Sequence, residues 1–221
     1  TANKNKIDNN IINKNIINKN KTDEVDSLFN KHLTSDLRKN VDYEDPFYIY
    51  LPWIIHHGDA LINMISKDQR YNIYKFDLIK GDIYDQTIRR KISAYVKDNQ
   101  SEYLDLIISR LISIKPHIKA FLFTFDWAPV MRTIVQACQI LEIPTILIPH
   151  ESVFADENKY YVDITAKASV PKTDFILGWG DLQKKIFQDR GYDVANSFEA
   201  VGAPKFDQYH NYKPQITREQ F

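Results

Sequence analysis

The feature that most constrains this sequence is a strand–helix–strand unit between residues 120 and 149. Ala120–Phe125 and Pro144–Pro149 are apolar almost throughout rather than alternating, which is typical of parallel strands covered on both faces. Pro129, a residue suited to the first position of a helix, predicts a helix that runs between them to about Leu141. Such a β-α-β unit builds one parallel sheet, and it predicts the α/β class.

The rest of the chain repeats this alternation of strand and helix. Further strands are expected in Phe47–Ile55, Tyr71–Phe76, Asp174–Leu177 and Phe198–Val201, and further helices in Ala60–Lys67, Asp85–Ser113 (divided at Asn99–Ser101) and Asp181–Arg190. Phe154–Lys172 is expected to be a long polar loop. The alternation predicts a Rossmann-like, doubly wound parallel sheet.

Residues 1–24 differ from this domain. They are rich in Asn and Lys, and the pentad Ile-Ile-Asn-Lys-Asn occurs at 11–15 and again at 16–20. A period of five fits neither a helix nor a strand, so a disordered low-complexity linker is expected, the alternative being a segment that folds on a partner. Residues 25–45 are expected to form a leading helix, and residues 46–210 the Rossmann-like domain.

Charge and cysteine content exclude several classes of protein. The 29 Lys and Arg residues balance 29 Asp and Glu residues, whereas a duplex nucleic-acid binder would need a basic excess. The single cysteine, Cys138, excludes an internal disulfide framework and a multi-cysteine zinc site. No apolar run reaches the roughly 20 residues that span a bilayer, and the sequence begins with polar residues rather than a signal peptide. A soluble, cytoplasmic protein is expected.

The candidate site consists of the residues that follow each predicted strand, because the ligand crevice of an open parallel sheet lies beyond the carboxyl ends of its strands. In chain order these residues are His56, His57 and Gly58; Asp126 and Trp127; His150 and Glu151; Trp179 and Gly180; and Gly202 and Pro204. Trp127, Trp179 and three of the six histidines follow predicted strands in this way, and Trp53, the third tryptophan, lies at the end of the first strand. This coincidence is more informative than any single residue.

His150 is the strongest candidate for a catalytic residue. It follows a buried strand directly and stands next to the carboxylate of Glu151. A neutral imidazole near pH 7 can take a proton from a hydroxyl nucleophile. The alternative is a structural histidine with a satisfied hydrogen bond. Asp126 is the second candidate; it could contact substrate, or it could cap the helix that begins at Pro129.

Glu151, beside His150, is the third candidate for a catalytic residue. The other candidates are binding residues, and several have a structural alternative. His56 and His57 could contact a ligand or only bound a turn. Gly58 could allow close backbone approach of a ligand, with Asp59 as a helix N-cap. Trp127 and Trp179 could stack on a sugar or base, or could close the edge of the sheet.

Motifs of several common chemistries are missing from the sequence. It contains no His-Glu-x-x-His, no cysteine cluster and no acidic loop with calcium spacing. It also lacks a G-x-S-x-G nucleophile elbow, a Walker loop and a complete G-x-G-x-x-G fingerprint. We therefore expect neither a metal nor a cofactor.

Two stretches resemble a known family. Pro144–His150, after an apolar helix, resembles the segment ending in Gln-His-Gly of bacterial surface-polysaccharide transferases, with Glu151 in place of the usual glycine. Asp174–Gly180, followed by a helix and Val201–Asp207, resembles their Trp-Gly and G-x-P-x-x-D ending. This group includes CDP-glycerol glycerophosphotransferase-like enzymes and capsule polymerases of the glycosyltransferase-B fold. The resemblance covers roughly residues 121–207.

The resemblance implies the N-terminal, acceptor-side half of such a fold, since the family binds its nucleotide-activated donor mainly on the second half. Residues 211–221 are then expected to begin a connection to a missing C-terminal domain. The implied reaction is attack of an acceptor hydroxyl on a nucleotide-activated sugar or polyol phosphate. His150 would be the general base or a phosphate contact, with Asp126 and His57 as alternatives.

The resemblance also implies partners and leaves other functions open. The partners would be a polysaccharide or glycolipid acceptor and the activated donor, with peripheral association at the inner face of the cytoplasmic membrane. One alternative is an enzyme similar to nucleotide-sugar 2-epimerases. Another is a non-catalytic module that binds glycans or scaffolds a polymerase, which is favoured if the strand-end residues diverge rather than face one crevice.

Overall fold

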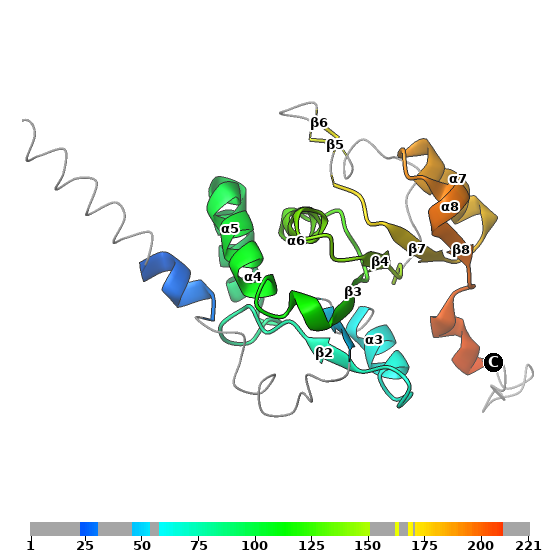
Figure 1. Cartoon of the computed structure of the whole chain (residues 1–221), viewed down its shortest axis with the longest axis horizontal. Coiled ribbons are helices and arrows are strands. Elements are labelled where there is room, and N and C mark those ends of the chain that lie inside the picture. Colours follow the sequence, from blue (N-terminus) through cyan, green and yellow to red (C-terminus); the bar gives the residue numbers. More distant parts are fainter. Residues whose placement is uncertain are drawn as a thin grey trace, which may run out of the picture.

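The computed structural model describes residues 23–30, 46–53, 58–150, 162–163, 168–169 and 171–209. Six parallel strands form its main sheet: β1 (Phe47–Tyr50), β2 (Ile73–Lys75), β3 (Ile118–Phe123), β4 (Thr145–Leu147), β7 (Phe175–Gly178) and β8 (Phe198–Ala200). Their order is β2-β1-β3-β4-β7-β8 (Figure 1). The fold is an α/β, Rossmann-like parallel sheet, as the sequence predicts.

Helices connect these strands. They are α3 (Ala60–Ile65), α4 (Gln86–Asp98), α5 (Gln100–Leu111), α6 (Pro129–Ile140), α7 (Asp181–Asp189) and α8 (Val194–Ser197), with the 3₁₀ helices η2 (Lys115–His117) and η4 (Pro204–Tyr209). The predicted division of Asp85–Ser113 is confirmed, because α4 ends and α5 begins on either side of Asn99. The short helix α8 was not predicted.

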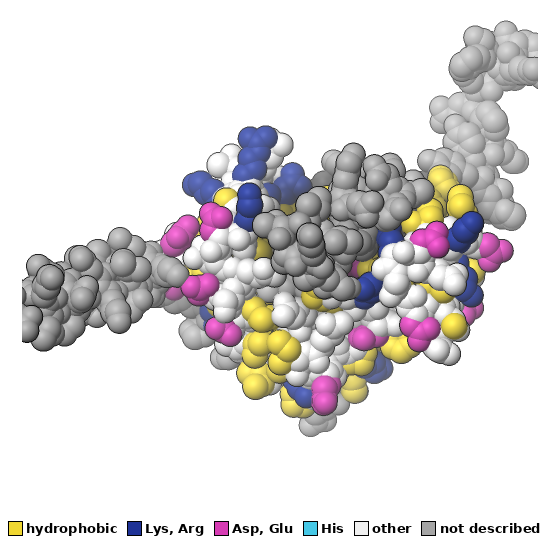
Figure 2. Space-filling model, turned by 90° about the horizontal axis from the view of Figure 1, so that it is seen from above, with side chains coloured by type: hydrophobic (Ala, Val, Ile, Leu, Met, Phe, Trp, Pro, Cys, Tyr) yellow, Lys and Arg dark blue, Asp and Glu magenta, His cyan; other side chains and the backbone are white. Residues whose placement is uncertain are grey.

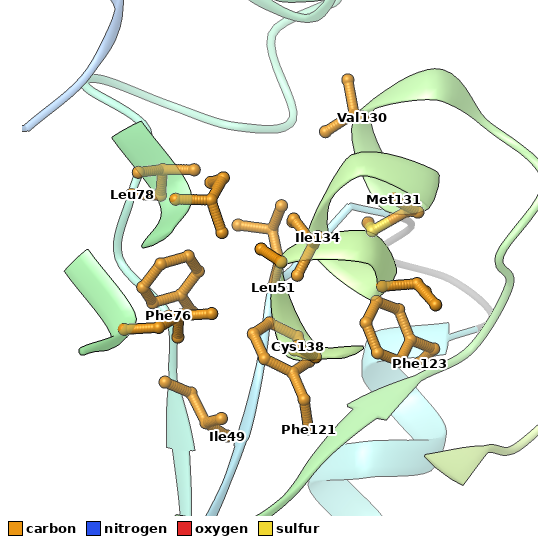
Figure 3. Close-up of a cluster of buried hydrophobic side chains, with 14 of the residues drawn as sticks. Ile49, Leu51, Phe76, Leu78, Phe121, Phe123, Val130, Met131, Ile134 and Cys138 are labelled. Carbon is orange, nitrogen blue, oxygen red and sulfur yellow. The ribbon is translucent and has the colours of Figure 1, made fainter. Parts of the chain in front are cut away.

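The two faces of the sheet bury different helices (Figure 1). Phe47 and Ile49 point from β1 into the larger core, which β3, α4, α5 and α6 also line. Figure 3 shows side chains of α6 directed toward those of β1 and β3 in this core. Tyr50 is the next residue of β1, and its side chain points to the opposite face of the sheet. There it packs with Leu61 and Ile62 of α3 in the smaller core. Helices on both faces make the sheet doubly wound.

The strand order reverses between β1 and β3. From β1 the chain passes through α3 to β2 on one side, and it then returns to place β3 on the other side of β1. The pairing of β1 with β3 is parallel and runs from Phe47–Ile118 to Tyr50–Leu122. Ligands of open α/β sheets bind at such a reversal, beyond the carboxyl ends of the two strands.

Only the first part of the helix expected over residues 25–45 is described, since residues 31–45 lie outside the described residues. Residues 23–28 are helical, and Phe29 leaves the helix to form an antiparallel bridge with Ile79. The reason is burial: Phe29 is 1% exposed and lies 5.5 Å from the ring of Tyr95 and 5.6 Å from that of Tyr103, between ring centres. Residues 23 and 24 are therefore helical rather than part of the expected linker; residues 1–22 and 211–221 lie outside the described part.

The predicted loop Phe154–Lys172 contains two short strands. β5 (Val162–Asp163) and β6 (Ala168–Ser169) pair antiparallel with each other and apart from the main sheet. The rest of this segment up to residue 170 lies outside the described residues.

Two further features concern the charged side chains on the surface and the length of the described helices. On the face in Figure 2, basic and acidic side chains are both spread over the surface, with one group of Lys and Arg side chains at the upper left. None of the described helices combines the length and apolar character needed to cross a bilayer.

Candidate functional site

Thr124, directly after β3, is the residue at which the carboxyl ends of three strands meet. Its carbonyl oxygen accepts hydrogen bonds from the backbone nitrogen of His150, at 3.2 Å, and from the Nδ1 of that residue, at 2.7 Å. Its side chain lies against Gly58, so closely that a Cβ on Gly58 would come within 2.2 Å of Thr124 Oγ1. Gly58 after β1, Thr124 after β3 and His150 after β4 are thus in contact.

The contact at Gly58 shows why this position is a glycine. From the sequence, Gly58 could allow a ligand to approach the backbone closely. The structure instead places the side chain of Thr124 where a Gly58 side chain would be, so the close approach is made by the chain itself. Gly58 therefore joins the loop after β1 to the end of β3.

The hydrogen bond at Nδ1 fixes the tautomer of His150. A carbonyl oxygen can only accept, so Nδ1 carries the hydrogen, and in the neutral ring Nε2 holds the lone pair. The ring is 5% exposed and meets the ring of Phe125 edge-on at 5.8 Å between ring centres. His150 is thus held in one orientation, with Nε2 as the nitrogen that can take a proton.

Asp126 is buried, with 2% of its surface exposed, and the hydroxyl of Tyr192 donates a hydrogen bond to its Oδ2. Asp126 does not occupy the N-cap position of α6, as the capping alternative requires: that residue is Ala128, which makes no side-chain cap hydrogen bond. Pro129 does occupy the first turn, as predicted. The carboxylate of Asp126 instead joins the end of β3 to the turn after α7.

The two tryptophans at this edge make structural contacts. The indole Nε1–H of Trp179 donates to the carbonyl oxygen of Pro149 at 3.1 Å, which links the ends of β7 and β4. Trp127 packs against the larger core, and its ring lies 5.6 Å from that of Phe125, between ring centres. Both contacts favour the alternative in which these residues close the edge of the sheet.

The remaining described candidates follow β7 and β8. Gly180 has extended backbone at the N-cap of α7, and among the described residues beyond its chain neighbours no atom lies within 4 Å of a Cβ built on it. Gly202 adopts φ +81°, a left-handed conformation that favours glycine, and Pro204 begins η4. His56, His57 and Glu151 lie outside the described residues.

Sequence reasoning missed Asp59 as a member of this site. It occupies the N-cap position of α3, but its side chain does not cap the helix. Instead it is 3% exposed and accepts a hydrogen bond at Oδ2 from the hydroxyl of Tyr84. Burial raises the pKa of the Asp59 carboxyl, while the hydrogen bond from Tyr84 and the positive charge of Lys75 act in the opposite direction. An Asp directly after Gly58 at a strand end was the only signal in the sequence.

Two more polar side chains lie at this end of β1, one beneath α3 and one that contacts the backbone of Trp53. Burial, followed by the charge of Asp59, raises the pKa of Tyr50 to about 12. Arg89 reaches from α4 and donates from Nη1 to the carbonyl oxygen of Trp53 at 3.4 Å. The carboxyl end of β1 thus holds a cluster of polar side chains from β1, α4 and the loops between them.

Within the described ranges, no group of three or more His, Cys, Asp or Glu side chains could hold a metal ion. No protein-family model matches the sequence, and no curated protein matches it.

Proposed function

We propose that this chain is the acceptor-side domain of a bacterial transferase that moves a sugar or polyol phosphate from a nucleotide-activated donor to a growing capsule or cell-wall polysaccharide. The proposal is supported by the resemblance of residues 121–207 to such enzymes and by a Rossmann-like sheet of the kind that the resemblance implies. The observation that carries it is the hydrogen bond of His150 Nδ1 to Thr124.

This hydrogen bond suits His150 to the role of general base. As the acceptor hydroxyl attacks the donor, its proton passes to Nε2, the bond from the acceptor oxygen to the transferred group forms, and the bond to the nucleotide breaks. The imidazolium that results still donates from Nδ1 to the carbonyl oxygen of Thr124. The same contact therefore orients the neutral ring and stabilises the charged one.

The arrangement of the strand ends supports an enzyme over a non-catalytic module. Gly58, Thr124 and His150 come from three neighbouring strand ends, and Gly58 and His150 both contact Thr124. A scaffolding module would be favoured by strand-end residues that diverge. Donor binding in this proposal belongs to a second domain, and peripheral association with the inner face of the membrane would serve a glycolipid acceptor.

The proposal is tested by transfer assays on the full-length protein with CDP-glycerol and UDP-sugar donors and a polysaccharide acceptor. His150→Gln keeps a hydrogen-bonding side chain but cannot accept a proton at neutral pH, so we expect turnover to fall by roughly 10²–10⁴-fold. His117→Gln is the matched control, because His117 lies in η2 at the opposite, amino end of β3. Near-normal turnover of the His150 variant would contradict the catalytic assignment.

A further inference from the structure

The two faces of the main sheet are covered to different extents. The larger core takes side chains from α4, α5, α6 and α7, whereas α3 is the only helix in the described part of the chain that contributes to the smaller core. In Figure 1, α6 and α7 lie above the strands, and α3 and η4 lie below them. A parallel sheet is normally covered on both faces. The part of the α3 face that lies farther from α3 therefore lacks a cover among the described helices.

The apolar side chains left open on this face belong to β4 and β7. Leu147 and Ile176 point into the larger core, so their neighbours Ile146, Phe175 and Leu177 point to the α3 face. Phe175 is 47% exposed, and Ile146 and Leu177 are half-buried at the margin of the smaller core. We call Ile146, Phe175 and Leu177 the open face.

The direction of the crossovers explains why this face is open. The connections from β3 through α6 to β4, and from β7 through α7 and α8 to β8, both step toward the β8 edge, and their helices line the larger core. The connection from β1 through α3 to β2 steps the other way, so α3 lies on the opposite face. Right-handed crossovers require this arrangement. A further step beyond β8 would not cover the open face, but a segment that crosses back from β8 would.

The chain after β8 starts from the right side of the sheet to do this. η4 follows β8 and lies on the same side as α3, with the ring of Phe206 at 6.0 Å from that of Trp179, between ring centres. Residues 210–221 follow η4. Fully extended, they span up to about 40 Å, whereas β4 lies two strand spacings, or about 10 Å, from β8. The segment is therefore long enough to cross the open face.

The sequence of this segment suits a cover. Thr217 and Gln220 have the spacing of a capping box, and Ile216 and Phe221 stand at the two positions of a hydrophobic staple. This pattern is typical of the start of a helix, and it brings two large apolar side chains together. Such a pair is the chemistry that an apolar sheet face accepts.

We infer that residues 210–221 fold back from the β8 edge and cover the open face, with Ile216 and Phe221 packed against it. The segment then lies beside α3 and completes the second helical layer of the sheet. The inference does not depend on the catalytic role of His150, and it goes beyond the proposed function: a domain that followed residue 221 would leave from the α3 side of the sheet.

The test is limited chymotrypsin digestion of the 221-residue chain, with mass spectrometry to follow cleavage after Tyr212. Cleavage requires the segment to leave the sheet, so its rate follows the population of the undocked form. Phe175→Asp should raise this rate about tenfold, which corresponds to about 1.4 kcal/mol of lost docking. Ile140→Asp is the matched control, because Ile140 is 55% exposed on α6, on the other side of the sheet. Equal rates in the two variants would overturn the inference.

A second measurement detects the cover from the sheet itself and uses a variant outside the described fold. Hydroxyl-radical labelling of Phe175 should increase in Ile216→Asp, while labelling of Ile140 stays the same. Labelling of Phe175 that ignores this substitution would overturn the inference. If it instead falls as the protein concentration rises, a second copy of the chain covers the open face in place of residues 210–221.

Discussion

The carbonyl oxygen of Thr124 accepts hydrogen bonds from two nitrogens of His150, the backbone nitrogen and Nδ1. Because one atom holds both the chain and the ring, the direction of the imidazole depends on the end of β3 as much as on β4. His150 is 5% exposed, so its side chain is buried at this edge of the sheet.

His150→Ala should therefore change both activity and stability. In the full-length protein turnover should fall by roughly 10²–10⁴-fold, because the proton acceptor is lost. The free energy of unfolding should fall by about 1 kcal/mol, because Thr124 keeps the backbone hydrogen bond and loses only the one from Nδ1. Urea denaturation and initial rates measure the two effects. A loss of stability with unchanged turnover would make His150 purely structural.

Gly58→Ala should destabilise the chain. The new Cβ would lie 2.2 Å from Thr124 Oγ1 and 2.8 Å from Thr124 Cβ, and overpacking of this kind costs about 1–3 kcal/mol. Adding Thr124→Ala, which removes Oγ1, should restore part of the loss. Gly180→Ala is the control, because no atom lies within 4 Å of the new Cβ; its effect should stay within about 0.5 kcal/mol. Equal effects at the two glycines in urea denaturation would contradict the close contact.

Asp59 and Asp85 should give pH dependences of opposite sign. Burial raises the pKa of Asp59 in the folded state, so ionisation of this carboxyl opposes folding as the pH rises through that pKa. Asp59→Asn should therefore gain stability relative to the wild type between the ordinary Asp pKa, about 3.9, and neutral pH.

Asp85 is the matched control for this experiment. Hydrogen bonds from the backbone nitrogens of Thr87 and Ile88 lower its pKa, so its ionised form stabilises the fold above the ordinary Asp pKa and this contribution is lost as the pH falls through the folded pKa. Asp85→Asn should then lose stability relative to the wild type as the pH rises. Urea denaturation of the three proteins across this pH range is the measurement, and parallel curves would contradict both assignments.

Tyr192→Phe should destabilise the fold by about 1–3 kcal/mol, because the buried carboxylate of Asp126 loses the hydroxyl that donates to it. Combination with Asp126→Asn in a double-mutant cycle should show coupling between the two residues. Tyr103→Phe removes a hydroxyl with no partner within the described part of the chain and should cause no such loss. An unchanged free energy of unfolding in Tyr192→Phe would contradict the structural role of this hydrogen bond and favour the catalytic role of Asp126 that the sequence suggests.

The isolated chain should bind nucleotides weakly or not at all. In the proposed function the donor belongs to a second domain, and the sequence carries no nucleotide-binding fingerprint of its own. Calorimetry with CDP-glycerol and UDP-glucose is the measurement. Micromolar binding by this chain alone would place the donor site here and contradict the assignment as an acceptor-side domain.

The elements were predictable where the local pattern was strong. The apolar runs before and after Pro129 gave β3, α6 and β4, and the helix division at Asn99 was also found. The order of the strands in the sheet was not predictable, because β1 pairs not only with β2 but also with β3, which lies far along the chain. The end of the leading helix at 28 was missed since it depends on burial of Phe29 between α4 and α5.

The residues of the candidate site also fall into some that the sequence could predict and others that it could not. His150 could be predicted because it follows a buried strand and belongs to a residue type suited to proton transfer. Thr124 could not, since it acts through a carbonyl oxygen that every residue has. The partners of Asp126 and Asp59, which are Tyr192 and Tyr84, lie 66 and 25 residues away. Such pairs are set by tertiary packing, and a sequence pattern does not show them.

The position of β1 between β2 and β3 also bears on how this protein is made. β1 emerges from the ribosome shortly before β2 and can pair with it soon afterwards, but Phe47 meets Ile118 only after both α4 and α5 have been synthesised. Until then one edge of an apolar strand stays unpaired, and such edges promote association with other chains. Nascent chains that stall between β2 and β3 should therefore depend on chaperones more than chains that stall after β4.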